Sequence, residues 1–339
     1  MIFPFTAIVG QDEMKTALIL NVIDPAIGGL LIMGEKGTAK STAVRALAEL
    51  LPEMETVKGC PFNCDPDGKV LCTACRERLR SQIPLERERR RMRVVELPLG
   101  ITEDRLVGTL DIEHALQKGE KRFEPGILAD ANRNFLYVDE VNLLEDHIVD
   151  LLLDSAAMGV NTVEREGVSF THPAGFILVG TMNPEEGDLR PQLLDRFGLC
   201  VQVLTITDRT QRVEILKRKA AFDADPQIFS RAWHKEQRRL ADRIESAKAR
   251  LESIDVSDET LERIVGITAA LNLDGHRGDI VMMKAARTLA AFREKEKIEL
   301  SDIVDAARSA LHHRMKRLPF EEIGSVGEKL QSLLAEIQV

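Results

Sequence analysis

The residues best suited to chemistry lie between Gly34 and Ser41, in the order Gly-Glu-Lys-Gly-Thr-Ala-Lys-Ser. An apolar, strand-like run precedes them and a helical pattern follows, which is the setting of a phosphate-binding loop. Glycines let the backbone turn so that its N–H groups converge on phosphate oxygens, and the next helix adds partial positive charge. We expect Lys40 to reach the β- and γ-phosphates of ATP and Ser41 to bind Mg²⁺. The other candidate nucleotide-binding residues of the loop are Gly34, Glu35, Lys36, Gly37, Thr38, Ala39 and Thr42.

Ala39 departs from the general pattern, which has glycine immediately before the lysine. We expect this position to lie at the start of the helix, where φ is negative and alanine fits without strain. Gly34 and Gly37 remain for the tight parts of the loop, so the site is expected to be functional.

A second motif runs from Phe135 to Glu140, where four apolar residues are followed by two acids. The apolar run predicts a buried strand, and the acids then emerge at the carboxyl end, where open α/β sheets bind ligands. We expect Asp139 to hold Mg²⁺, directly or through water, and Glu140 to act as the general base on the attacking water. A phosphate-binding loop about 100 residues upstream makes this pairing specific.

Four further residues are candidates for sensing or stabilising the γ-phosphate. Asn183 follows the strand-like run 176–179 and is predicted to orient water. Arg196, in Leu-Leu-Asp-Arg-Phe, is predicted to be an arginine finger supplied to the next subunit, with Arg190 as the second candidate. Arg277 opens a later helix and is a candidate second sensor. Val9, ahead of the first helix, is a candidate for the adenine pocket.

The elements that must position these residues alternate in the first half of the chain. Apolar strand-like runs at 30–33, 135–138, 176–179 and 200–204 are separated by helical patterns, which predicts a parallel sheet covered on both faces. Residues 163–171 read as part of a hairpin. After about residue 208 only helical patterns follow, around 240–251, 259–271, 280–294 and 302–316. The predicted fold is therefore an α/β P-loop domain with a helical lid.

Composition narrows the function classes. The chain has 339 residues, which suits two domains, and a formal net charge of −9. An arginine-rich stretch, residues 87–93, is interleaved with glutamates and has no aromatic residues for base stacking, so it predicts a solvated helix face or loop rather than a nucleic-acid site. No run approaches the roughly 20 apolar residues of a membrane span. The N-terminus does not resemble a signal peptide, so we expect a cytoplasmic protein or an organelle protein without its transit segment.

Taken in order, these elements resemble AAA+ ATPases, and the segments between them resemble the ATPase (I) subunits of magnesium chelatase. Residues 97–113 look like the insertion in helix 2 of that family, and residues 123–126 and 141–147 are similar to it on either side of the acidic motif. Residues 161–167 and the long run 183–198 are similar as well. By this resemblance, residues 1–208 form the AAA+ core, with a cysteine- and arginine-rich insertion at 57–93 and the helix-2 insert at 94–125. Residues 209–254 form a helical linker, and 255–339 form the lid.

The resemblance also implies partners and cofactors. Such subunits form a ring, expected to contain six copies, with ATP and Mg²⁺ at the subunit boundaries. The ring works with a D-type AAA+ subunit carrying an integrin-like domain and a large porphyrin-binding H-type subunit, which inserts Mg²⁺ into protoporphyrin IX. The residues themselves are consistent with this division, since we find no histidine or carboxylate cluster suited to holding a porphyrin.

Four of the five cysteines, Cys60, Cys64, Cys72 and Cys75, are spaced C-x3-C-x7-C-x2-C in a turn-rich segment. Four thiolates at this spacing are candidates for a Zn²⁺ site. An iron–sulfur cluster, a redox-responsive thiol pair and reduced thiols without a ligand are the alternatives. Family members that lack all four cysteines have a similar Pro-Phe-Asn stretch, so the cluster is not expected to serve the core mechanism. Cys200, in a strand-like run, is predicted to be a small core residue.

Other functions remain open at the level of sequence. A cobalt-chelatase-type ATPase or an AAA+ chaperone that remodels a metalloenzyme has the same catalytic residues. A nucleotide-binding scaffold without turnover is disfavoured by Glu140 and Arg196, and a DNA-remodelling ring is disfavoured by the acidic balance.

Overall fold

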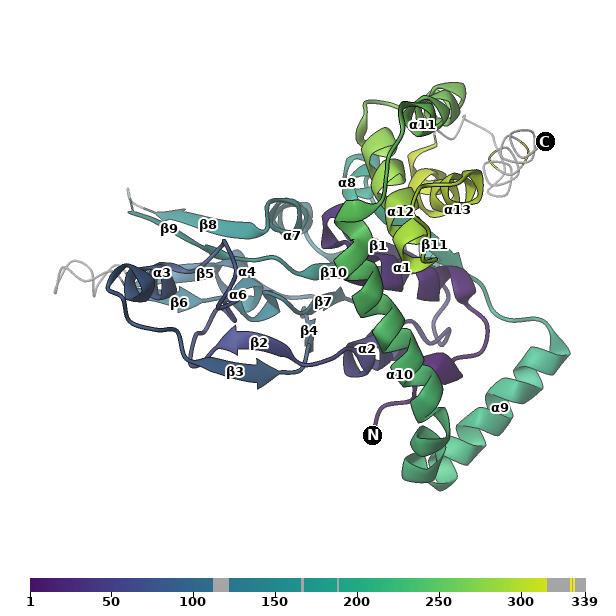
Figure 1. Ribbon diagram of the computed structural model, residues 1–339, viewed down its shortest axis with the longest axis horizontal. Coiled ribbons are helices and arrows are strands. Elements are labelled where there is room, and N and C mark those ends of the chain that lie inside the picture. Colours follow the sequence, from purple (N-terminus) through teal and green to yellow (C-terminus); the bar gives the residue numbers. More distant parts are fainter. Residues whose placement is uncertain (112–121, 166–167, 188, 316–329, 331, 333–339) are drawn as a thin grey trace. The chain divides into compact units, whose positions relative to one another are not determined.

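The structure, a computed structural model, describes residues 1–111, 122–165, 168–187, 189–315, 330 and 332. The chain divides into two compact units (Figure 1), one made of residues 3–38 and 183–339 and the other of residues 39–182. The predicted helix 302–316 extends beyond the described residues at its last position.

The unit of residues 39–182 contains three parallel strands in the order β10-β7-β4: β10 Ile177–Met182, β7 Phe135–Val138 and β4 Val94–Glu96. Ile177 and Val94 both lie level with Phe135 in the register. Every residue of β7 and β10 is buried, as predicted for a strand covered on both faces. Helix α2, Lys40–Leu50, packs on β7 and β4 and begins at the phosphate-binding loop. Helix α7 spans Asp146–Met158.

Among the described residues, three antiparallel strand pairs complete this unit. They are β2 Met54–Val57 with β3 Arg87–Arg90, β5 Gly108–Asp111 with β6 Arg122–Pro125, and β8 Val160–Arg165 with β9 Val168–Pro173. The last of these confirms the predicted hairpin. Short helices α3 Thr73–Arg80, α4 Glu103–Val107 and α6 Ile127–Ala131 lie between the strands. Figure 1 shows α3 and the β8–β9 hairpin at one end of the unit and α2 at the other.

The arginine-rich stretch differs from its prediction, because residues 87–90 form strand β3 rather than a helix face or loop. Its side chains alternate between exposed and half-buried, the period of a hairpin edge. Arg87 forms ion pairs of 2.7 Å with Glu55 and Asp67, and Arg91 pairs with Glu49. Arg87 and Arg91 in this stretch therefore each have an acidic partner.

The other unit holds the parallel pair β1 Leu30–Gly34 and β11 Leu199–Val203, in which Leu30 lies level with Leu199 and Gly34 level with Val203. Helix α1, Asp12–Ile23, packs against both strands. The short helix α8, Pro191–Arg196, immediately precedes β11. The parallel strands in both units confirm the predicted α/β class.

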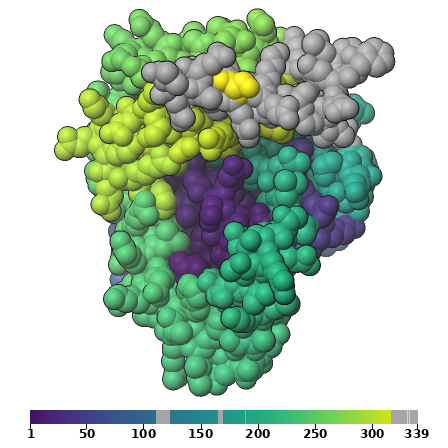
Figure 2. Space-filling view, turned by 90° about the vertical axis from the view of Figure 1, so that its right-hand side faces the viewer, coloured from purple at the N-terminus to yellow at the C-terminus, as the bar shows by residue number. Residues whose placement is uncertain are grey.

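Between β11 and residue 315 the long elements are helices, as predicted: α9 Arg209–Ala224, α10 Pro226–Arg250, α11 Asp258–Ala270, α12 Arg277–Phe292 and α13 Leu300–Leu311. Ile244 and Ala247 form the buried stripe of the charged helix α10. Figure 2 shows the N-terminal residues (purple) with green α10 on one side and the yellow-green lid above. The N-terminal segment is bonded to α10, because the Thr6 backbone N–H donates to the side-chain oxygen of Gln237 at 3.0 Å. Among the described helices, none combines the length and apolar character needed to cross a bilayer.

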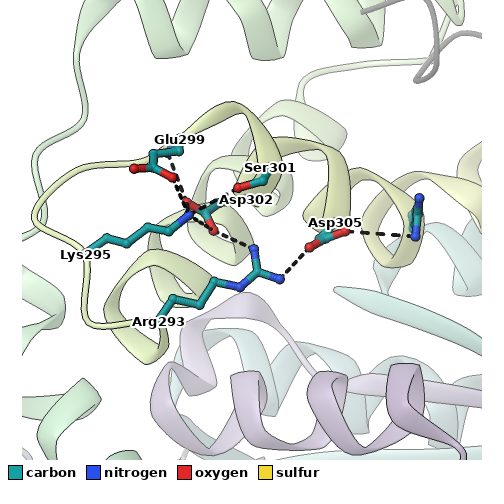
Figure 3. Close-up of polar contacts among 7 residues, drawn as sticks. Arg293, Lys295, Glu299, Ser301, Asp302 and Asp305 are labelled. Atoms are coloured by element: carbon teal, nitrogen blue, oxygen red, sulfur yellow. Dashed lines mark hydrogen bonds and ion pairs between the residues drawn. The ribbon is translucent and has the colours of Figure 1, made fainter. Parts of the chain in front are cut away.

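A buried carboxylate fixes the start of α13 (Figure 3). Asp302 is fully buried and pairs with Arg293 at 2.7 Å and Lys295 at 2.8 Å. It also accepts from the Glu299 backbone N–H at 3.0 Å, completing a reciprocal cap with Glu299. Burial alone lowers the pKa of Arg293, but its hydrogen bonds to Asp305 and Asp302 outweigh burial and raise it. The lid helices α12 and α13 are therefore joined by a satisfied charge network rather than by apolar contact alone.

Candidate active site

The phosphate-binding loop leaves β1 at Gly34, where only glycine fits. Its φ is 151°, and a Cβ at this position would lie 2.1 Å from the Val203 carbonyl oxygen. Gly37 also has a positive φ, 82°. Two side chains of the loop form polar contacts with other residues of the protein. The Thr38 hydroxyl donates to the Glu35 carbonyl at 2.8 Å, and Lys36 forms an ion pair with Glu186 at 2.7 Å. The positive φ angles at Gly34 and Gly37 are the turns that a phosphate-binding loop needs.

The expectation for Ala39 was wrong. Ala39 is the N-cap of α2 and has φ 64° and ψ 21°, in the left-handed region, not the negative φ of a helix start. The loop makes its last turn at this residue before the helix begins, and a left-handed turn there is what glycine normally supplies. Alanine is held in this conformation at a cost of roughly 1–2 kcal/mol.

The Asp139 carboxylate is fixed by two hydroxyl groups at the end of β7. Thr181 Oγ1 donates to Asp139 Oδ1 at 2.5 Å, and the Tyr137 hydroxyl donates to the same oxygen at 3.1 Å. Gly180 lies level with Val138 in the parallel register, so Thr181 and Asp139 are the next pair beyond it. Asp139 is exposed, and a carboxylate held in this way is a suitable ligand for Mg²⁺.

Tyr137 connects the two predicted Mg²⁺ ligands. Its hydroxyl lies within hydrogen-bonding reach of Ser41 as well as of Asp139. Burial, and then the Asp139 carboxylate, raise the pKa of Tyr137, so its hydroxyl keeps its proton as a donor. Ser41 and Lys40 are the first residues of α2 and both are half-buried. Within the unit of residues 39–182 the structure therefore brings Ser41 and Asp139 to one shared neighbour.

Glu140, the predicted base, follows Asp139 with φ 53° and ψ 54°. Its backbone N–H donates to Thr181 Oγ1 at 3.2 Å, so one threonine holds both acids of the motif. Thr181 and Tyr137 were not identified from the sequence. The signal for Thr181 was available, because a strand parallel to β7 places its end residues beside Asp139, but the register is needed to choose Thr181 over its neighbours.

Asn183 is buried at the end of β10, and its side-chain oxygen accepts from the Glu185 backbone N–H at 3.3 Å. This bond caps the 3₁₀ turn Pro184–Glu186. The cap uses the amide oxygen, so a bound water or phosphate oxygen would be contacted by the amide nitrogen.

Helix α8 ends at Arg196, whose side chain is half-buried, and its N-cap residue is Arg190, which is exposed. The preceding residue, Asp195, pairs with Arg277 at 2.9 Å and with Arg314 Nε at 3.2 Å. Arg314 also donates to the Asp195 carbonyl at 2.8 Å and to the Phe197 carbonyl at 2.6 Å. Burial lowers the pKa of Arg314 to about 10, although the Asp195 carboxylate opposes that shift. The predicted finger and second sensor are thus joined through Asp195, within one unit.

Val9 is half-buried, and the next residue, Gly10, lies close to the side chain of Ile206, which follows β11. Gln11 has φ 54°, caps α1 and donates to the Leu204 carbonyl at 3.0 Å. The placement of adenine at Val9 stays a prediction.

The four clustered cysteines meet in space. Their sulfur atoms all lie within 4.8 Å of one another, and all four side chains are buried. Cys200 is buried in β11 beside Met33, and burial raises the pKa of its thiol to about 12, as expected for a core residue.

The comparisons with known proteins agree with this geometry. A model of the AAA domain (dynein-related subfamily) matches residues 75–197, and a model of the AAA lid domain matches residues 261–333. These matches support the α/β core followed by a helical lid.

Two relatives cover nearly the whole chain. The magnesium-chelatase subunit ChlI homolog of Methanocaldococcus jannaschii is 54 % identical, over 99 % of this chain and 92 % of its own length. The chloroplastic magnesium-chelatase subunit ChlI of Nicotiana tabacum is 52 % identical, over 98 % of this chain and 79 % of its own length.

A solved structure is similar at the level of both sequence and fold. It is a chain from the complex between subunits BchI and BchD of magnesium chelatase, 48 % identical, with a TM-score of 0.55, covering 97 % of this chain and 99 % of that one. A chain from Cytophaga hutchinsonii at 16 % identity, with a TM-score of 0.62, shares the fold.

Proposed function

The chain belongs to the family of magnesium-chelatase ATPase subunits, ChlI, and we propose that it is the AAA+ motor of a chelatase complex of that type. It hydrolyses ATP, and partner subunits use that hydrolysis to insert Mg²⁺ into protoporphyrin IX. The near full-length relatives carry this conclusion, and the shared contacts of Ser41, Tyr137 and Asp139 give it a chemical basis.

Each residue of the site has a separate role in ATP hydrolysis. The backbone of residues 34–39 and Lys40 bind the phosphates, while Ser41 and Asp139 hold Mg²⁺, which neutralises phosphate charge when bound. Glu140 accepts a proton from the attacking water, and Asn183 orients that water. Thr181 and Tyr137 donate to Asp139 and so fix the carboxylate before the nucleotide arrives. This preorganisation lowers the reorganisation needed in the transition state.

Two arginines complete the site in this proposal. Arg196 contacts the γ-phosphate of the neighbouring subunit, and Arg277 contacts the nucleotide from the lid. Because Arg277 pairs with Asp195, nucleotide binding would exchange that pair for a phosphate contact. Because each subunit supplies its arginine to the active site of the next, hydrolysis depends on assembly of the head-to-tail ring.

The assembly proposed here is a homo-oligomeric ring, expected to be a hexamer. The similar chain in a BchI–BchD complex supports a D-type partner, and an H-type porphyrin-binding subunit follows from the proposed function. ATP and Mg²⁺ are the cofactors implied by the AAA domain. Zn²⁺ at the cysteine cluster is a separate proposal, and no step of hydrolysis involves it. The domain boundaries at 208 and 254 and the cytoplasmic location stay predictions.

The first test is steady-state ATP hydrolysis by the purified chain with Mg²⁺, beside Glu140→Gln, over a range of protein concentrations. Turnover per subunit should rise with concentration and be absent in Glu140→Gln. Reconstitution with D- and H-type subunits should then produce Mg-protoporphyrin. Equal turnover in both proteins would contradict the assignment of Glu140, and cobalt insertion without magnesium insertion would favour a cobalt-chelatase-type complex.

A further inference from the structure

We propose that Cys60, Cys64, Cys72 and Cys75 hold one Zn²⁺ ion, and that this ion fixes a cysteine module against the residues that lead into β7. The cysteine module is defined as residues 57–90, from the last residue of β2 through α3 to the end of β3. Nothing in this proposal depends on ATP turnover.

The distances match a single ion with four thiolate ligands. A zinc–sulfur bond of about 2.3 Å in a tetrahedron requires sulfur atoms about 3.8 Å apart. Cys60 Sγ and Cys72 Sγ lie 3.8 Å apart, and all four sulfur atoms fall within 4.8 Å of one another. The thiolates of an iron–sulfur cluster bind different irons around a larger core, so they need wider spacing than this.

The backbone presents the cysteines as two pairs. Gly59 with φ 73° and Asn63 with φ 46° turn the chain around Cys60 and Cys64. Cys72 is the N-cap of α3 and Cys75 lies in its first turn, so both sulfur atoms lie at the positive end of a helix. The Cys72 backbone N–H donates to Cys64 Sγ at 3.2 Å. A donor aimed at a ligand atom is what stabilises a metal-bound thiolate.

The burial of all four cysteines supports their binding one metal ion together. The cysteines provide half of the buried cluster of this region, and their neighbours in it are Val57, Phe62, Leu71 and Ala129. Such a small apolar set supplies little folding free energy, whereas a four-thiolate site supplies it directly. A disulfide would join only two of the four at about 2.05 Å.

The module is bonded to the turn between α6 and β7. Asn132 Nδ2 donates to the Phe62 carbonyl at 2.7 Å, and Phe62 lies between the first two cysteines. Arg133 pairs with Asp65 of the module at 3.2 Å, and it also donates to the carbonyl of Glu55, in β2 just before the module, at 2.5 Å. Residues 132–134 enter β7, which carries Asp139 at its far end. A metal that fixes Phe62 therefore also fixes the entry to the acidic motif.

Phe62 extends the module toward two hairpins. Its ring lies 6.2 Å from Phe123 of β6, 6.0 Å from Phe170 of β9 and 4.8 Å from His172. His172 is not a fifth ligand, because its Nδ1 contacts the Pro173 carbonyl at 2.8 Å and its Nε2 contacts Asn161 at 3.0 Å. Burial lowers the pKa of His172, so the ring stays neutral in this aromatic group.

The test is the metal content of the full-length chain, purified under reducing conditions and measured by inductively coupled plasma mass spectrometry. We expect one zinc per chain, lost in Cys72→Ser and retained in Cys200→Ala, the matched control for a buried cysteine outside the cluster. Reduced, metal-free wild-type chain should also bind one Co²⁺ with the intense visible bands of a tetrahedral thiolate site, a readout that needs no variant. Iron with acid-labile sulfide in place of zinc, or neither bound zinc nor a cobalt spectrum, would overturn the proposal.

The bracing role has its own readout. Chelation of the metal should speed amide hydrogen exchange at Arg133 and Phe135, whose N–H groups bond to Gly175 and Arg93. Exchange at the α12 amides, in the other unit, serves as the internal control and should not change. If exchange at Arg133 and Phe135 were the same with and without metal, the module would not brace β7. A chain that fails to hydrolyse ATP but holds one zinc would leave this proposal standing.

Discussion

The Asp195 carboxylate accepts a hydrogen bond from the Arg277 guanidinium at 2.9 Å. Asp195 precedes the predicted arginine finger in the sequence, and Arg277 is the first residue of α12, the predicted lid sensor. The same carboxylate pairs with the buried Arg314, which also binds backbone carbonyls at the end of α8. The position of the finger is therefore determined jointly by α8 and by two lid arginines.

Asp195→Asn is expected to lower the free energy of unfolding by about 2 kcal/mol. This value lies between the small effect of an exposed pair and the large effect of leaving a buried charge without its partner. Arg277→Gln removes only the half-exposed pair and should cost less than about 1 kcal/mol. Urea unfolding of both variants beside the wild type measures the difference. Equal stability of the three proteins would show that Asp195 does not tie the lid to α8.

Thr181→Val should weaken the response to Mg²⁺. The substitution keeps the shape but removes the hydroxyl that donates to Asp139 and accepts from the Glu140 backbone. Losing a group that orients a metal ligand typically lowers affinity or activity by about 10- to 100-fold. The measurement is the Mg²⁺ concentration that gives half-maximal ATP hydrolysis. Thr181→Ser restores the hydroxyl and should restore most of the response, whereas equal defects in the two variants would point to packing.

Ala39→Gly should stabilise the chain by about 1 kcal/mol, because glycine adopts the left-handed conformation of this residue without the strain of a Cβ. The matched control is Ala220→Gly, at an exposed position inside α9, which should cost about 0.5–1 kcal/mol. The thermal midpoints of the two variants should move in opposite directions. A lower midpoint for Ala39→Gly would mean that the loop holds no strain at this residue.

These residues show what the sequence could predict. Strand β7 matches its prediction at both ends because four consecutive apolar residues are followed directly by acids. The cysteine cluster was visible from spacing alone, and the structure brings its sulfur atoms together. The conformation of Ala39 was not predictable from residue type, since it is fixed by the turn that the loop makes before α2. The contact between Thr181 and Asp139 depends on the parallel register of β10 on β7, and the formation of strand β3 depends on its pairing with β2. Both are interactions between residues far apart in the sequence.

Mixing two inactive variants tests whether Arg196 acts in trans. Arg196→Ala should lower turnover by about 10³-fold or more while nucleotide binding persists, since an arginine finger acts on the transition state. Glu140→Gln should be inactive for a different reason, the loss of the base. In a mixed ring, a subunit with intact Glu140 can face a neighbour with intact Arg196, so the mixture should recover part of the wild-type rate. Arg190→Ala mixed with Glu140→Gln is the control for the second candidate. If a mixture of Arg196→Ala and Glu140→Gln stayed as inactive as each variant alone although mixed rings had formed, Arg196 would not serve its neighbour's site.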